Sequence, residues 1–317
     1  MRRAALLAIL CLTGCTSNNP RDRAIRKALD FIDRSASDPR NFADYGADYL
    51  FCFYTTAAST ADPELRDAAA RIGRKHAKRW AATKMVVTPN ASADEVGDMV
   101  EGWYAASRLG QDDSRIKPVL RDAAARFAPV DFLLFDPAKE PPPSDRKASK
   151  YSIWLDALIA TYMGEQYGIP LGGSYSDVLK WLPLMRPYPP TGQGTYINQF
   201  YDVTYAITHL VYTQNDYGVY AVPRVGFGPE FEYLHRNLAL AVESLHDPET
   251  VGEFLDSLKA FGLGDDDPAI RKGTQYLLET QQPDGSWTPP DVADAYTRYH
   301  SAWTGMGGLQ QSRWLDR

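Results

Sequence analysis

The stretch that decides the fold is FGLGDDDPAIRKGTQYLLETQQPDGSW, residues 261–287. Asp267-Pro268 in this stretch combines an aspartate cap with proline at the first helical position, which is typical of a helix start. The helix that follows runs up to a pair of glutamines, and the polar turn after it ends in Trp287. The stretch therefore predicts a helix closed by a turn that carries a large aromatic side chain.

The same stretch belongs to an internal duplication with a spacing of about 150 residues. VGEFLD at 251–256 and KAFGLGDDDPAI after it match VGDMVE at 96–101 and AASRLGQDDSRI after it. Three more pairs recur in the same order, and each has one member in either half of the chain. In the first pair, residues 44–45 and the following LFCFYTT match residues 202–203 and the following THLVYTQ. In the second pair PVLRDAAARF matches AIRKGTQYLL, and in the third KYSIW matches RYHSAW. The chain is thus predicted to contain two related halves, at about 24–185 and 195–317, within one domain, 24–317.

The repeated segments have the pattern of helices rather than strands. Segments such as LRDAAARIGRKHAKRW and VGEFLDSLKAFGL place apolar residues at helical intervals. Asp62-Pro63 and Asp247-Pro248 repeat the start signal of Asp267-Pro268. No stretch alternates apolar and polar residues convincingly enough for a strand. The predicted fold class is all-α, built of helical hairpins.

The turn Gln281, Gln282, Asp284, Gly285, Ser286 and Trp287 carries a family resemblance. It resembles one QW repeat of the terpenoid cyclase and protein prenyltransferase superfamily. The resemblance implies an (α/α)6 toroid of stacked hairpins with a pocket at one end, and it implies that Trp287 is a structural clasp. The catalytic signatures of that superfamily are not matched, because Asp265–Asp267 precede the clasp helix and are better explained as its cap.

The N-terminus predicts export and lipidation. A basic start and the apolar run AALLAILCL precede Leu12-Thr13-Gly14-Cys15. This ending resembles the lipobox of bacterial lipoproteins, which implies cleavage after residues 1–14 and acylation of Cys15 as a membrane anchor. Residues 15–23 are then a tether. Thr16 after the cysteine favours, by the same resemblance, the outer membrane of the cell envelope.

Composition narrows the class of partner. Loss of Arg2 and Arg3 with the signal leaves 32 basic and 40 acidic residues, a net charge of −8. A chain with this charge and no basic run is a poor nucleic-acid binder. The mature chain keeps only Cys52 besides the lipidated cysteine, so no intramolecular disulfide is expected and Cys52 is predicted to be a buried thiol.

The halves differ where chemistry is expected. His209 stands where the first half has Phe51, and His300 stands where it has Ser152. Glu253 belongs to an acidic pair, Glu253 and Asp256, that both halves keep as Asp98 and Glu101. Two imidazoles with carboxylates are a common set of ligands for zinc or iron. We therefore name His209, Glu253 and His300 as candidate metal ligands, with Asp202 and Asp216 as further oxygen donors.

The alternative interpretation makes both histidines structural, as hydrogen-bonded core side chains. His76 lies in a basic helix, GRKHAKRW, and is predicted to be solvated, whereas His235 and His246 are expected at the surface. Three functions stay open: a metal-assisted enzyme, a metal-free terpenoid- or glycan-active enzyme, and a lipoprotein that only binds a small molecule, a glycan or a protein partner.

Overall fold

The computed structural model describes residues 19–144, 148–189 and 197–315. These residues form helices joined by loops, so the all-α prediction is confirmed. Within the described ranges extended pairing is limited to two isolated bridges, Thr60 with Ser312 and Tyr220 with Leu315. None of the described helices is both long enough and apolar enough to cross a membrane.

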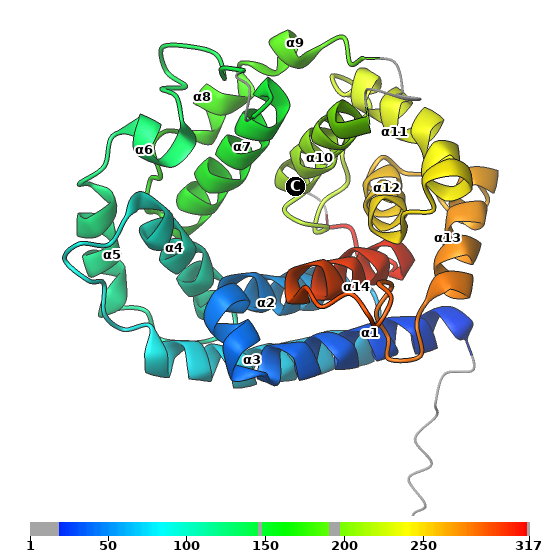
Figure 1. Cartoon of the computed structure of the whole chain (residues 1–317), viewed down its shortest axis with the longest axis horizontal. Coiled ribbons are helices and arrows are strands. Elements are labelled where there is room, and N and C mark those ends of the chain that lie inside the picture. Colours follow the sequence, from blue (N-terminus) through cyan, green and yellow to red (C-terminus); the bar gives the residue numbers. More distant parts are fainter. Residues whose placement is uncertain (1–18, 145–147, 190–196, 316–317) are drawn as a thin grey trace, which may run out of the picture.

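Six helices form an inner ring around the centre of the molecule (Figure 1). Each contacts the next, and the last contacts the first. In ring order they are α2 (Pro39–Ser59), α4 (Ala93–Arg108), α7 (Lys150–Tyr167), α10 (Ile197–Gln214), α12 (Pro248–Ala260) and α14 (Ala295–Leu309).

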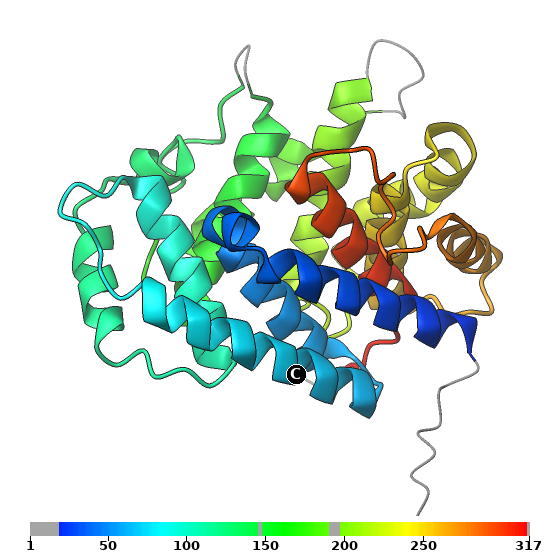
Figure 2. The same ribbon diagram turned by 60° about the horizontal axis from the view of Figure 1, so that its bottom comes forward.

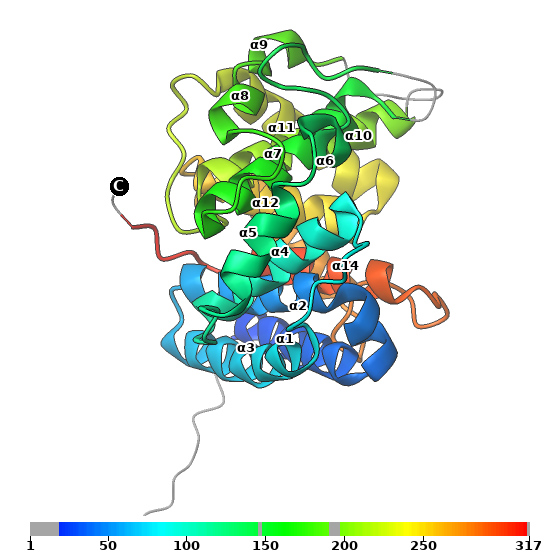
Figure 3. The same cartoon turned by 90° about the vertical axis from the view of Figure 1, so that its left-hand side faces the viewer.

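The other helices cover the ring from outside. In Figure 2 the long helix α1 runs beside α3 across the face of the ring, and in Figure 3 α8 and α9 lie at the edge opposite α1 and α3. The outer elements are α1 (Pro20–Ser37), α3 (Pro63–Thr83), α5 (Ile116–Ala124), α6 (Pro129–Leu133), α8 (Tyr175–Leu179), α9 (Leu182–Met185), α11 (Gly228–Leu240), the π-helical turn η1 (Ala241–Leu245) and α13 (Pro268–Thr280).

The helix starts predicted from Asp-Pro pairs are confirmed. Asp62, Asp247 and Asp267 each accept hydrogen bonds from backbone amides of the first turn of α3, α12 and α13, and proline follows each cap. Such a cap satisfies amides that have no partner inside the helix. The caps fix where each hairpin begins.

The duplicated segments occupy equivalent places in the ring. The sequence matches pair α2 with α10, α4 with α12, and α7 with α14. Members of each pair lie three positions apart among the six inner helices, which places them across the ring from one another. The two halves therefore contribute equal shares of the wall around the centre.

The turn at Trp287 ties the last hairpin to the first helix. Trp287 is 2 % exposed, and its indole N–H donates to the Leu277 carbonyl at 2.8 Å. Gln281 donates to the carbonyl of Ala24 in α1 at 2.8 Å. Gly285 has φ +100°, and a Cβ there would lie 2.2 Å from the Lys27 carbonyl oxygen. The close approach of this turn to α1 requires glycine and joins the two ends of the chain.

Candidate functional site

A small pocket lies between α2, α10, α12 and α14, where the two halves meet. Its volume is about 60 Å³. Polar and aromatic side chains alternate around it. The lining residues are Thr55, Thr56, Ser59, His209, Tyr212, Tyr217, Glu253, Asp256, His300, Trp303, Thr304, Gly307 and Gln310.

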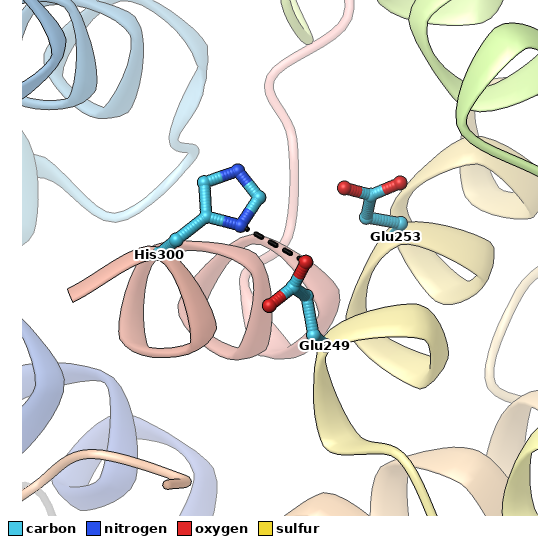
Figure 4. A group of neighbouring side chains, drawn as sticks. All are labelled: Glu249, Glu253 and His300. Carbon is cyan, nitrogen blue, oxygen red and sulfur yellow. Dashed lines mark ion pairs between the residues drawn. The ribbon is translucent and has the colours of Figure 1, made fainter. Parts of the chain in front are cut away.

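Three ionisable side chains converge beside this pocket, and two of them, Glu253 and His300, line it. Glu249, Glu253 and His300 each offer a ligand atom, and these atoms all lie within 4.8 Å of one another. Glu249 and Glu253 are one turn apart on α12, so they share a face, and His300 reaches them from α14 (Figure 4). Among the described residues this is the only such group of three.

Glu249 and His300 form an ion pair. His300 Nδ1 lies 3.2 Å from Glu249 Oε1, but Nδ1 has no hydrogen-bond partner among the described residues. Burial alone would raise the pKa of Glu249, yet His300 and the hydroxyl of Tyr205, 3.0 Å away, outweigh it and lower that pKa. For His300 burial acts to lower the pKa, and the acids around it raise it instead. Each shift favours the charged form of its group, so the two side chains stabilise one another as an ion pair.

The pKa of Glu253 is shifted in the opposite direction to that of Glu249. Glu253 is fully buried, and burial raises its pKa to about 8. Its Oε2 accepts a hydrogen bond from Thr208 at 2.6 Å, whereas its Oε1 is buried without a partner. An unpartnered buried carboxyl oxygen is costly unless a cation, a proton or a ligand meets it. Glu253 is thus the group of the pocket most in need of a partner.

His209 lines the same pocket but lies outside the group of three. Its Nδ1 meets the Tyr205 carbonyl at 2.9 Å, and burial lowers its pKa to about 4. The ring is therefore neutral near pH 7, with Nδ1 donating to the carbonyl and the lone pair on Nε2. This tautomer is the one that a histidine uses to bind a metal through Nε2.

The two predicted aspartates are not brought to the centre. Asp202 lies on α10 two turns before His209, outside the residues that line the pocket. Asp216 follows α10 in a left-handed conformation, with φ +54°, and accepts a hydrogen bond from Tyr162. Neither belongs to the group of Glu249, Glu253 and His300. The expectation that they add oxygen ligands is not supported by this geometry.

Sequence reasoning missed Glu249. The signal that would have found it is the spacing Glu249-x-x-x-Glu253, which puts two carboxylates one above the other on a helix. The comparison of halves concentrated instead on Glu253 and Asp256. In the structure Asp256 lines the pocket as well, and its Oδ1 is also buried without a partner.

The first half has an acidic cavity without histidine. Asp98, Glu101 and Asp156 line a space of about 500 Å³ beside α4 and α7. Burial, together with the charges of Asp48 and Asp98, raises the pKa of Glu101 well above its usual value. Asp48 accepts a hydrogen bond from Tyr299 at 2.5 Å, and it raises the pKa of His300 as well. Asp48 therefore links the two halves electrostatically.

The other predicted residues have varied outcomes. Cys15 lies outside the described residues, so its lipidation stays a prediction. Cys52 is buried, as expected, and His235 and His246 are exposed. The prediction for His76 is wrong.

His76 is 2 % exposed and stacks on Phe53, with its Nε2 2.7 Å from Asp33 Oδ1. Its place on the apolar stripe of α3, beside Ile72 and Trp80, outweighs its basic neighbours in sequence. It is a structural histidine that joins α3 to α1.

The chain matches no protein-family model and no curated protein. The functional argument therefore rests on the geometry of the pocket.

Proposed function

We propose that this chain is a lipid-anchored protein of a bacterial envelope whose helical domain binds one divalent transition metal ion through Glu249, Glu253 and His300. The observation that carries the proposal is the convergence of their three ligand atoms within 4.8 Å. Two of the atoms at this place, Glu253 Oε1 and His300 Nδ1, are buried without a hydrogen-bond partner. A cation would satisfy the carboxyl oxygen directly, and the His300 nitrogen would bind it once its proton is released.

The ligand set fits zinc or iron. Imidazole with carboxylates is a common environment for these ions, with metal–ligand distances of about 2.0–2.2 Å. Ligand atoms on one tetrahedral ion are about 3.5 Å apart, so the three side chains would close by roughly 1 Å on binding. Three protein ligands leave a position for water or a small ligand, where the ion acts as a Lewis acid.

The domain proposal is a single (α/α) toroid of two halves, anchored through Cys15. The ring of inner helices and the turn around Trp287 support it, because both agree with what the QW resemblance implies. The pocket of about 60 Å³ supports a small molecule, or one end of a larger one such as a glycan, as the ligand.

The test is metal content of the purified mature domain without its lipid. Wild type incubated with zinc and then desalted is expected to retain about one ion per chain. Glu253→Gln and His300→Ala are expected to retain none, because each removes a ligand. His235→Ala, which removes an exposed histidine, is the matched control and should keep the ion.

Helix content measured by circular dichroism separates loss of the site from loss of the fold. Wild type that binds no zinc, iron or manganese would contradict the proposal. The same conclusion would follow if folded Glu253→Gln and His300→Ala retained as much metal as His235→Ala.

One observation favours a second candidate function, a metal-free acid–base enzyme. Glu249 and Glu253 lie one turn apart on α12, but the pKa of Glu249 is lowered while burial raises that of Glu253 to about 8. Two carboxyl groups whose pKa values are shifted in opposite directions are typical of the acid and the base in glycan-active enzymes. Turnover of a glycan or terpenoid substrate at full rate in EDTA would favour this alternative, and binding without turnover would favour a non-catalytic lipoprotein.

A further inference from the structure

Two acceptor oxygens in the lining of the pocket have no donor in the part of the chain that the structure describes. Asp256 Oδ1 and Gln310 Oε1 are both buried without a partner, and Gln310 is only 6 % exposed. Thr55 and Thr304 donate their hydroxyl protons to carbonyls of their own helices, Phe51 and Ser301 respectively. These hydroxyls therefore have only lone pairs left for a ligand.

Hydroxyl groups of Ser59, Tyr212 and Tyr217 also line the pocket. Asp256 Oδ1 and Gln310 Oε1 nevertheless have no donor within the described ranges, and a ligand that brings several N–H or O–H groups would satisfy both oxygens. The aromatic side chains of Tyr212, Tyr217 and Trp303 line the same pocket. Aromatic faces attract a cation, and a buried carboxylate attracts it more strongly. From this combination we infer that the pocket binds the ammonium group of a small amine, with Asp256 and Gln310 as its acceptors.

The charge of Lys259 acts against the rise that burial causes in the pKa of Asp256, although its ammonium protons are donated elsewhere. Lys259, one turn further along α12, donates its ammonium protons to the carbonyls of Gly308 and Gln310. His300 is seven residues before Gly307 on α14, which is about 10 Å along the helix. Burial raises the pKa of Asp256 to about 6, so the carboxylate is mostly ionised at pH 7.

The size of the pocket limits the amine. A water-sized group needs roughly 10–15 Å³ of such space. The pocket volume of about 60 Å³ therefore accepts about four groups of this size. Ethanolamine has four non-hydrogen atoms, and ethylene glycol differs from it by a hydroxyl in place of the ammonium group. A comparison of the two compounds therefore measures what the positive charge of the ammonium group contributes to binding.

Gly307 offers a variant that blocks this place without removing a ligand. A Cβ on Gly307 would lie 3.5 Å from Asp256 Oδ2, an ordinary contact, and no closer atom surrounds it. Gly307→Ala should fold well, because alanine is the better helix former. Its methyl group would occupy the space next to the carboxylate.

The inference deepens the proposed function and rests on it for the other end of the ligand, which would face the metal site. Binding of the amine end is measurable without the metal ion. We expect calorimetric titration in EDTA at pH 7 to show that wild type binds ethanolamine at least tenfold more tightly than ethylene glycol. Asp256→Asn and Gly307→Ala should each weaken ethanolamine binding at least tenfold, and His235→Ala should not change it.

The outcomes separate the two proposals. Zinc content of Asp256→Asn and Gly307→Ala should equal that of wild type, because neither changes a metal ligand. Equal binding of both probes, no binding of ethanolamine, or unchanged ethanolamine binding by folded Gly307→Ala would overturn the amine site. A wild-type chain that binds ethanolamine but no metal would overturn only the metal site.

Discussion

Replacement of Glu253 by glutamine should stabilise the metal-free protein and destabilise it in the presence of metal. Glutamine has nearly the shape of the protonated carboxyl group, and its carbonyl oxygen can still accept the hydrogen bond that Thr208 donates at 2.6 Å. It cannot ionise in either the folded or the unfolded chain. The variant therefore isolates the cost of keeping a buried carboxyl group at this place.

The magnitude follows from the pKa of Glu253, which burial raises from 4.5 to about 8. A raised folded-state pKa contributes stability that is complete below pH 4.5 and is lost as the pH rises towards 8. At 1.36 kcal/mol per pKa unit, Glu253 lowers the free energy of unfolding by about 1 kcal/mol at pH 5 and about 3 kcal/mol at pH 7. Glu253→Gln should recover these amounts in EDTA.

A bound metal ion reverses the effect of Glu253→Gln on the free energy of unfolding. The ion needs the ionised carboxylate, and a ligand that binds only the folded chain at 100 times its Kd adds about 2.7 kcal/mol of stability. Wild type should gain this increment from zinc, whereas Glu253→Gln should gain little. The assay is urea unfolding of both proteins at pH 5 and pH 7, in EDTA and in zinc.

Two results would refute this reasoning. If Glu253→Gln were less stable than wild type at pH 7 in EDTA, Glu253 would not be a buried acid of raised pKa. If zinc stabilised both proteins equally, the ion would bind elsewhere. Urea unfolding of His235→Ala under the same conditions controls for zinc bound by this exposed histidine.

Three further predictions concern the anchor, the clasp and His209. Cys15→Ser should leave the chain without acyl groups and out of the membrane fraction, because the thioether has no other site, and acylated Cys15→Ser in membranes would contradict the anchor. Gly285→Ala should lower the free energy of unfolding by more than the control Gly262→Ala does. Gly262 has a similar φ of +87° but open space around it, so its replacement should cost about 1 kcal/mol. Equal losses of stability in urea unfolding would contradict the close approach of Gly285 to α1. The pKa of His209 is lowered to about 4, so its contribution to stability is present above pH 6.5 and falls by about 3 kcal/mol at pH 4. His209→Phe should remove this acid loss, and an unchanged pH profile would contradict a buried neutral ring.

The helices were predictable because their signals are local. An Asp-Pro start needs only neighbouring residues, and Asp62, Asp247 and Asp267 all act as caps. His76 shows where local reading fails. Its neighbours in sequence are basic, but its neighbours in space are Phe42 and Phe53, and spatial neighbours decide burial.

Two of the three members of the candidate site were predictable from a comparison of the duplicated halves. Glu253 and His300 were named by that comparison, and both belong to the group of three. Glu249 was missed because the comparison followed the acidic pair of Glu253 and Asp256 and did not include the acid one turn before it, although the first half has an acid there too, Asp94.

The site itself depends on both changed and unchanged positions. An acid one turn before the shared acidic pair is common to the halves, as Asp94 or Glu249, so it predates any specialisation of the second half. Asp94 is exposed and lines the cavity of about 500 Å³, where Asp98 and Glu101 lack a histidine partner. In the second half His300 pairs with Glu249 and lowers the pKa of that carboxylate, while Glu253 stays buried and protonated. His300 on α14 therefore accounts for the lowered pKa of Glu249, whereas burial accounts for the raised pKa of Glu253, and the two causes together separate two acids whose ligand atoms lie within 4.8 Å of that histidine.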